Sequence, residues 1–269
     1  MTGTDRTPDR VAEPPRSIGT ESTPPPKVDL HHAATVLNAA IAAGHAEAVL
    51  GPLTELWSAV PRHVDEGVLR LLHECGVAMA THLPTSLEAA RTLRRGTGVL
   101  RDHDHLPLAV LHGRHELAVH RRRDDNPDAT ASALLDLSRT YRAQGRLHRV
   151  VDCADQMLET YGRHHHNNGF TRTLSYLGTL MIEARRPDAA IKHLTRATDT
   201  NPSSDPRRLA ECQALLSRAC RLSGNHHTAD RHLNRALATA LGTDERTVRY
   251  VHELADGTCQ LPPPTTPKE

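Results

Sequence analysis

Residues 134–158, LLDLSRTYRAQGRLHRVVDCADQML, recur twice more along the chain, as LSYLGTLMIEARRPDAAIKHLTRAT at 174–198 and as QALLSRACRLSGNHHTADRHLNRAL at 213–237. The three segments align without a gap, and equivalent positions lie 40 and then 39 residues apart. A small residue follows leucine in the first half of each copy, at Ser138, Gly178 and Ser217. Such a period is typical of a repeat protein, in which each unit buries its apolar face only against its neighbours.

The repeated segments have the spacing of paired helices. Apolar residues recur at intervals of three and four, and turn residues such as Gly145 and Gly224 interrupt the pattern near the middle of a copy. No stretch alternates apolar and polar residues as a half-buried strand would. Small residues let two helices approach closely, and larger apolar side chains fill the space around the contact. The sequence therefore predicts an all-α protein built of antiparallel helix pairs.

The same residues resemble the tetratricopeptide repeat (TPR) family. The small residue after leucine, the turn glycine, the alanine early in the second helix and the closing Pro202 match the family's pattern over roughly residues 131–241. Residues 126–146, NPDATASALLDLSRTYRAQGR, are similar to the longer kinesin-light-chain-type repeats that are common in actinobacterial signalling proteins. The resemblance implies a right-handed α-solenoid, a superhelix of antiparallel helix pairs with a concave surface that binds partners.

Composition and pattern divide the chain into five parts. These are a disordered N-terminal tail at 1–27, degenerate helical repeats at 28–130, three TPR-like repeats at 131–241, a capping helix at 242–256 and a disordered C-terminal tail at 257–269. Within 28–130 we expect one helix pair at 35–57 around Gly44 and another that ends near His120. Over the whole ordered part of the chain we expect about six helix pairs. Thr85 is expected to cap the first helix of the latter pair, with Glu88 reaching back to the cap amide.

Composition also excludes several classes of protein. The chain has 269 residues and a formal net charge of +1, so its bulk charge indicates no particular partner. Its five cysteines are scattered and include no C-x-x-C pair, a pattern typical of reduced thiols in the cytoplasm. No apolar run reaches the roughly 18 residues that a membrane-spanning helix requires. We therefore expect a soluble, cytoplasmic protein with no membrane partner.

Three consecutive histidines stand out in YGRHHHNNGF, residues 161–170. They lie between the second helix of one repeat and the first helix of the next. Adjacent side chains in a loop diverge, whereas metal sites use spaced ligands with supporting hydrogen bonds. We interpret the triplet His164 to His166 as a solvated turn, and we expect its replacement by alanine to leave folding nearly intact.

A second histidine-rich stretch, HGRHELAVH at 112–120, is the better metal candidate. His112, Glu116 and His120 recur every four residues along one stripe of a helix. However, a rise of ~1.5 Å per residue places the two histidines about 12 Å apart, so a third ligand would have to come from elsewhere. The string matches neither H-E-x-x-H nor H-x-x-E-H. The polar flank of an amphipathic helix is the favoured interpretation.

No catalytic or nucleotide-binding motif is present in the sequence. It lacks G-x-x-x-x-G-K-[ST], G-x-S-x-G and the dinucleotide-binding fingerprint. The arginines in HRRRDDNPD, residues 120–128, are compensated by the aspartates that follow, and six aromatic residues are few for stacking on nucleic-acid bases. The sequence therefore predicts no catalytic residue, no cofactor and no direct nucleic-acid partner.

The resemblance implies which residues line the concave groove. Carried over position by position, the side of the first helices that faces away from the small packing residue includes Leu135, Arg139, Arg142, Arg172, Ser175, Thr179, Ile182, Glu211, Ala214, Arg218 and Arg221. Five of these residues are arginines, which Glu183 and Glu211 partly offset. Guanidinium groups form bidentate hydrogen bonds to carboxylates, so such a groove favours an acidic segment or a C-terminal carboxylate. The alternative is that arginine is simply the usual solvated residue of this sequence.

Two functions remain open from the sequence. The favoured one is a protein–protein interaction module, a scaffold or a regulatory or sensory protein, that binds a peptide or protein segment in its groove. The alternative is a metal-dependent or otherwise cryptic enzyme that uses the histidine clusters.

Overall fold

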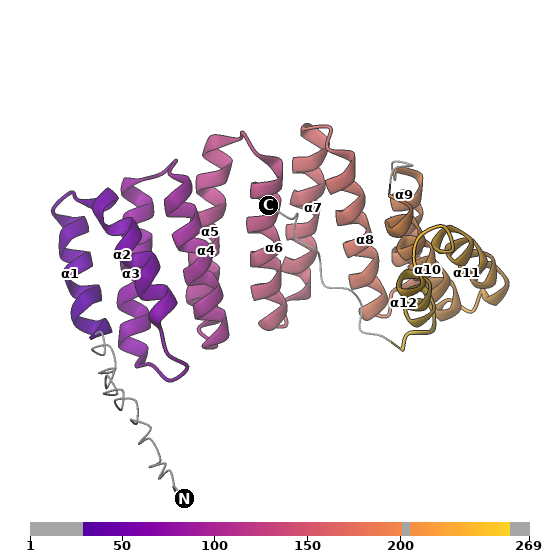
Figure 1. Ribbon diagram of the computed structural model, residues 1–269, viewed down its shortest axis with the longest axis horizontal. Helices are drawn as coiled ribbons and strands as arrows, with labels where there is room; N and C mark the ends of the chain where they lie inside the picture. The colour runs from indigo at the N-terminus through magenta and orange to yellow at the C-terminus, as the bar shows by residue number, and fades with distance from the viewer. Residues whose placement is uncertain (1–28, 201–204, 259–269) are drawn as a thin grey trace, which may run out of the picture.

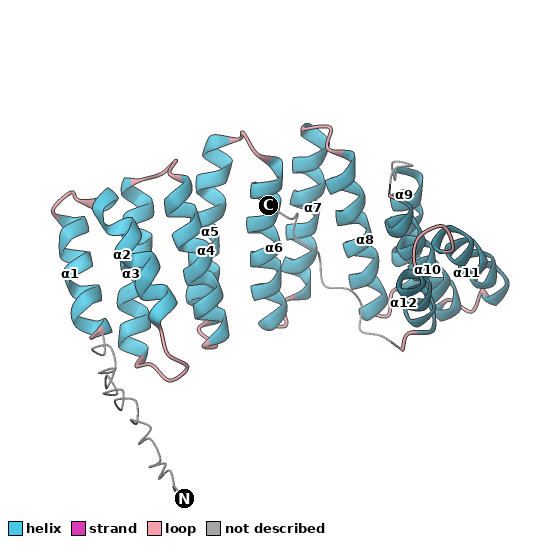
Figure 2. Ribbon diagram, in the orientation of Figure 1, coloured by secondary structure: helices cyan, strands magenta, loops and turns pink. Residues whose placement is uncertain are grey.

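The computed structural model describes residues 29–200 and 205–258. In these ranges the chain forms helices joined by turns and short loops, with no strand, and the helices follow one another in an extended row (Figure 1; Figure 2). The described helices are α1 (Leu30–Ala42), α2 (Ala46–Ala59), α3 (Glu66–His82), α4 (Leu87–Asp102), α5 (Leu106–Arg123), α6 (Pro127–Ala143), α7 (Leu147–Arg163), α8 (Asn167–Glu183), α9 (Pro187–Thr200), α10 (Pro206–Leu222), α11 (His226–Ala240) and α12 (Glu245–Asp256). This arrangement confirms the predicted all-α solenoid.

The two predicted tails fall largely outside the described residues. All of 1–27 and 259–269 lie outside the described ranges. Pro202, which the repeat pattern singled out, lies outside them as well. The first residue of the expected C-terminal tail, Gly257, ends α12 with a φ of 76°, and its N–H donates to the Glu253 carbonyl.

Four antiparallel helix pairs form the regular part of the solenoid. In each of them, α4 with α5, α6 with α7, α8 with α9 and α10 with α11, the two helices pack more extensively against each other than against any other helix. Each of the three aligned sequence segments lies within one of the last three pairs. We refer to α4, α6, α8 and α10 as first helices and to α5, α7, α9 and α11 as second helices. The terminal helix α12 packs against α10 and α11.

The close approach inside a pair depends on the small residue that the alignment singled out. Gly178 of α8 faces Leu194 of α9, and a Cβ atom at Gly178 would lie 2.6 Å from Leu194 Cδ2. Leu194 and Ala190 of α9 are both fully buried. The missing side chain at residue 178 therefore allows α8 and α9 to pack closely, because even one added methyl group would overlap the leucine.

Two large hydrophobic clusters follow one another along the row of helices, and a small third cluster contains Leu174, Ala197 and Cys212. One large cluster contains buried residues from Ala34 to Ala109, and the other contains buried residues from Val110 to Ala255. The clusters meet on α5, which supplies Ala109 to the first and Val110 to the second. The core is thus a strip along the solenoid, as expected where each helix contacts only its near neighbours.

The three N-terminal helices depart from the regular pairing. The sequence grouped 35–57 as one pair, and α1 and α2 do contact each other, but α1 packs more extensively against α3. In turn α2 packs against α4 and α3 against α5. The expected count of about six pairs is therefore replaced by four regular pairs, with α1 to α3 before them and α12 after them. Gly44 could not reveal this difference from the sequence. It forms a left-handed turn, with a φ of 90°, as Gly145 and Gly224 do inside the regular pairs.

Helix α4 begins one residue later than expected. Its N-cap is Ser86, whose side chain accepts a hydrogen bond from the Ala89 amide at 3.2 Å. The predicted cap, Thr85, was wrong because two good capping residues stand side by side and only the packing of α4 selects between them.

Among the described helices, none is long and apolar enough to cross a membrane.

Candidate functional site

Polar side chains join successive first helices to one another and join the ends of this row to α2 and α12. Five bonds of 2.6–2.7 Å link them in order: Thr54 to Thr92, Arg94 to Ser132, Ser138 to Tyr176, Ser175 to Cys212 and Arg221 to Asp256. They connect α2 to α4, α4 to α6, α6 to α8, α8 to α10 and α10 to α12. The bonded residues lie 35 to 38 positions apart, close to the repeat length. These helices therefore form one continuous row, and we call the side of this row that carries Arg139, Arg142, Arg172, Arg218 and Arg221 the first-helix face.

Two of the expected groove arginines lie on α6, and both contact carboxylates of the chain itself. Arg139 binds Asp136 at 2.9 Å, and the same carboxylate binds Arg94 of α4 at 3.0 Å. Arg142 binds Glu183 of α8 at 2.6 Å. Arg142 and Glu183 both remain partly exposed, whereas Asp136 is largely buried. The positive charge that the sequence predicted is present, but it is substantially neutralised.

The expected groove residues of α8 differ in their access to solvent. Arg172 and Ser175 are half-buried, and the Ser175 hydroxyl contacts Cys212 Sγ. Thr179 is buried, and its hydroxyl donates to the Ser175 carbonyl. The apolar residues carried over from the resemblance are buried as well, namely Leu135, Ile182 and Ala214. Because neighbouring first helices pack against each other, fewer of the predicted groove residues are exposed on the first-helix face than the sequence indicated.

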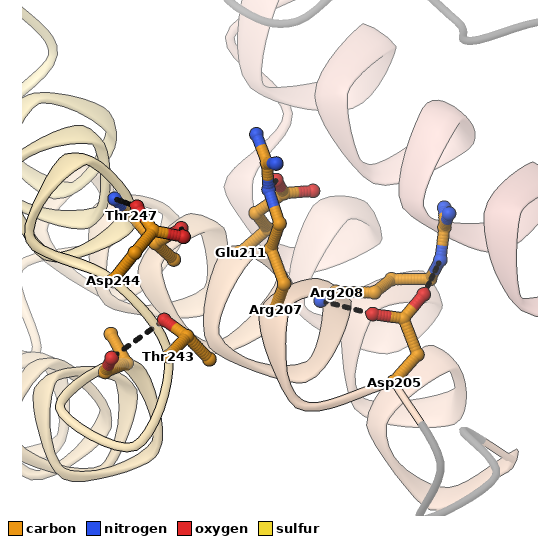
Figure 3. Close-up of polar contacts among 8 residues, drawn as sticks. Asp205, Arg207, Arg208, Glu211, Thr243, Asp244 and Thr247 are labelled. Atoms are coloured by element: carbon orange, nitrogen blue, oxygen red, sulfur yellow. Dashed lines mark hydrogen bonds and ion pairs between the residues drawn. The ribbon is translucent and has the colours of Figure 1, made fainter.

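The C-terminal end of the first-helix face carries the remaining expected residues. Arg221 binds Asp256 of α12 at 2.7 Å, and the Arg218 guanidinium lies beside Gly257 at the end of the same helix. Figure 3 shows the neighbouring start of α10, where Glu211 is held by Arg207 at 3.3 Å. In the same view Asp205 accepts hydrogen bonds from the backbone and the side chain of Arg208 (Figure 3).

The sequence missed two of the carboxylates that offset these arginines. It named Glu183 and Glu211 but not Asp136 or Asp256. Asp136 stands three residues before Arg139, a spacing at which side chains on a helix meet, so this pair was open to prediction. Asp256 reaches Arg221 only because α12 packs on α10, a contact that no repeat pattern indicates.

A buried carboxyl group lies close to the Asp136 ion pairs. Glu116 of α5 is almost fully buried, and its Oε2 has no hydrogen-bond partner among the described residues. Burial, reinforced by the Asp136 carboxylate and opposed by Arg94, raises the pKa of Glu116 to about 8. Glu116 is therefore mostly protonated at pH 7. The Arg94 guanidinium then pairs with the Asp136 carboxylate and not with Glu116.

The His112 ring is packed in the core of the solenoid. The ring is fully buried, with Nδ1 3.3 Å from the Leu93 carbonyl and Nε2 3.4 Å from the His73 carbonyl. Burial, together with the neighbouring His73, lowers the pKa of His112 to about 3, so the ring is neutral and only one nitrogen can donate. Within residues 29–200 and 205–258, no three His, Cys, Asp or Glu side chains are placed to hold a metal ion. Of the three residues in this stripe, His112 and Glu116 are buried in the core and His120 is half-buried.

The histidine triplet forms the turn between α7 and α8, but its three members differ. His164 lies beside Asp124, and His165 has a left-handed φ of 52°. His166 is the N-cap of α8, since its Nδ1 accepts a hydrogen bond from the Gly169 amide at 3.1 Å. Its ring also stacks on Tyr161. A turn was predicted, but a capping role for His166 was not, because histidine is an uncommon N-cap.

Solved structures with a similar fold are known, although no sequence relative was found. No family model matches the chain, and no curated protein matches its sequence. A Podosopora anserina protein described as a kinesin light chain with nearly identical TPR-like repeats is 12% identical, with a TM-score of 0.50, over 80% of this chain and 97% of that one. BtubC from P. vanneervenii is 14% identical, with a TM-score of 0.50, over 87% of this chain and 95% of that one.

Identities this low concern the fold alone. They agree with the helix pairs that recur every 39 to 40 residues and with the small residues at the contacts between helices. The chain is a TPR-like α-solenoid.

Proposed function

We propose that the chain is a protein-interaction scaffold that holds a peptide or protein segment on its first-helix face. The single observation that carries this proposal is the continuity of that face from α4 to α12, with arginines that already bind carboxylates. Arg142 with Glu183 and Arg221 with Asp256 bridge different helices at 2.6 and 2.7 Å. The guanidinium groups are thus positioned for carboxylate binding, which supports an acidic segment as the partner.

The intramolecular ion pairs do not block such a partner. The side chains of Arg142 and Glu183 are 44% and 31% exposed, and an ion pair between partly exposed groups contributes only ~0–1 kcal/mol. A partner carboxylate that forms a better-aligned, bidentate contact can therefore replace Glu183 at low cost. The enzyme alternative loses its best candidate site, because His112 and Glu116 are buried in the core.

The proposal is tested by selecting binders from a random peptide library on the full chain. The affinities of the selected peptides are then measured by fluorescence anisotropy for the natural chain and for Arg139→Glu combined with Arg218→Glu. We expect the double reversal to weaken binding by about tenfold or more, which is the effect of losing one or two charge-assisted hydrogen bonds. The dependence of binding on salt should fall at the same time.

A matched control is available on α11, where Arg231 and Arg235 are exposed. Arg231→Glu combined with Arg235→Glu changes the net charge by the same amount away from the first-helix face, and it should leave the affinities within about twofold. Unchanged binding and salt dependence in the Arg139 and Arg218 variant, with its fold intact by circular dichroism, would refute the proposal.

A further inference from the structure

A hollow lies between two second helices, α5 and α7. Its volume is about 570 Å³, and its floor includes Leu117 of α5, Leu134 and Leu137 of α6 and Cys153 of α7. Leu134 and Leu137 stand on a different side of α6 from the pair Arg139 and Arg142, since residues three or four apart share one side of a helix. The hollow is therefore distinct from the first-helix face.

A second hollow of about 370 Å³ adjoins the first on the side of α3. Its lining includes Ala80 and Thr81 of α3 and His115 of α5. Ala118 and Arg122 of α5 line both hollows. We call the combined depression across α3, α5 and α7 the second-helix groove. Its volume is within the ~300–1,000 Å³ of typical ligand pockets, enough for several side chains of a bound segment.

The rim of the second-helix groove is strongly basic. Four arginines, Arg114, Arg121, Arg122 and Arg149, face one carboxylate, that of Asp152. The aspartate lies 3.3 Å from Arg149. Among the groove's other groups, burial raises the pKa of Cys153 to about 12, which keeps the thiol protonated, and burial with Arg122 lowers the pKa of His115, which favours the neutral ring.

Three of these arginines form no ion pair with a carboxylate in the described part of the chain. Arg114 donates to the Tyr141 hydroxyl at 3.2 Å, and Arg121 donates to the Gln156 side-chain oxygen at 2.6 Å. Both acceptors are neutral, and Arg122 has no ion pair with any described residue. This differs from the first-helix face, where Arg142 and Arg221 each bind an acidic side chain. The positive charge of the groove is thus available to an anionic partner.

We propose that the second-helix groove is a separate docking site for an acidic peptide segment that carries one apolar anchor side chain. The apolar floor between α5 and α7 receives the anchor, and the guanidinium groups of Arg114, Arg121 and Arg122 bind the flanking carboxylates. A nucleic acid fits less well, because Tyr141, the one Phe, Tyr or Trp side chain among the described lining residues, is buried and provides no surface for stacking bases.

Two defined pools of fluorescent nine-residue peptides serve as probes. Both carry leucine or phenylalanine at the centre; one pool has glutamate or aspartate on either side, and the other has glutamine or asparagine. We expect the full chain to bind the acidic pool about tenfold or more tightly than the neutral pool in anisotropy titrations. Two variants perturb the groove independently: Arg121→Glu with Arg122→Glu reverses its charge, and Ala118→Phe fills its floor without a change of charge.

Each groove variant should weaken binding of the acidic pool by about tenfold, while the α11 control, Arg231→Glu with Arg235→Glu, should not. Equal binding of the two pools, or full binding by both folded groove variants, would overturn the proposal. Competition by a thymidine oligonucleotide at the affinity of the acidic pool would overturn it too, in favour of nucleic acid. Loss of binding in Arg139→Glu with Arg218→Glu alone would refute this site and leave the proposed function intact.

Discussion

Glu116 shows at the scale of one residue how packing overrides the preference of a side chain. The repeat geometry turns this position of α5 into the core, and a carboxyl group is tolerated there because it takes up a proton. From the sequence, Glu116 was assigned to a polar stripe with His112 and His120, because residues four apart share one side of a helix. Such a pattern describes the side as a whole and does not show which of its residues is buried. It could not show that Asp136 and Arg94 of neighbouring helices would surround the carboxyl group.

Replacing Glu116 with glutamine removes its titration and keeps its shape. The folded pKa of about 8 lies above the ordinary value of 4.5, so the stabilisation by the protonated form is complete below about pH 4.5 and is lost as the pH rises to about 8. The loss is at most ~1.4 kcal/mol per pH unit. We expect Glu116→Gln to match the natural chain in urea unfolding at pH 4.5 and to be more stable at pH 8. A difference that does not change with pH would contradict the burial of this carboxyl group.

The histidine triplet offers a test of two neighbouring backbone roles. His166→Ala removes the N-cap of α8 and should lower the free energy of unfolding by ~0.5–2 kcal/mol. His165→Gly should raise it by up to about 1 kcal/mol, because glycine adopts a φ of 52° without steric cost. Urea denaturation monitored by circular dichroism measures both. Equal and negligible effects would restore the initial interpretation of a merely solvated turn.

At the scale of helices, the contact between α8 and α9 depends on one missing side chain. Gly178→Ala places a methyl group against Leu194, and we expect it to cost roughly 1–3 kcal/mol by overpacking. Gly98→Ala is the matched control, since Gly98 also lies inside a helix but has no neighbouring atom within 4 Å of an added Cβ. That change should stabilise the chain by roughly 0.5–1 kcal/mol. Thermal melts of the two variants that shift in the same direction would contradict the close packing of this pair.

The turns between helices extend the same reasoning. Gly145 and Gly224 adopt the left-handed conformation that the sequence indicated, whereas Arg185 holds the equivalent turn with a φ of 57°. Arg185→Gly should therefore raise the free energy of unfolding by up to about 1 kcal/mol, and Gly145→Ala should lower it by a similar amount. A stabilising Gly145→Ala in urea unfolding would show that this turn is misassigned.

What the sequence predicts at this scale depends on repetition. Helices α6 to α11 follow from the self-alignment, because three copies specify the same small and apolar positions. The packing of α1 on α3 has no repeated counterpart, so the local pattern at 35–57 led to the wrong partner for α1. The second-helix groove was missed for a similar reason. Its arginines lie on two different helices, and the absence of carboxylates around them becomes visible only when α5 and α7 are placed side by side.

At the scale of the whole molecule, the described helices form one row that carries two surfaces with arginines. The first-helix face is long and largely neutralised by its own carboxylates, whereas the second-helix groove is short and has three arginines without an acidic partner. Each helix contacts only its near neighbours, so both surfaces are formed by stacking alone and can be altered separately. A scaffold of this kind could bind two segments at once, which increases the effective affinity for a partner that carries both.

The most direct test of the central claim is a hydrogen-exchange footprint of a peptide bound to the full chain. The peptide is selected on the Ala118→Phe variant, so that the second-helix groove is filled. We predict slower exchange in α6, α8 and α10, around Arg139, Arg172 and Arg218, with no change in α11. Protection confined to second helices, or its absence from α6, α8 and α10 for every selected peptide, would contradict the claim that the first-helix face is the binding surface.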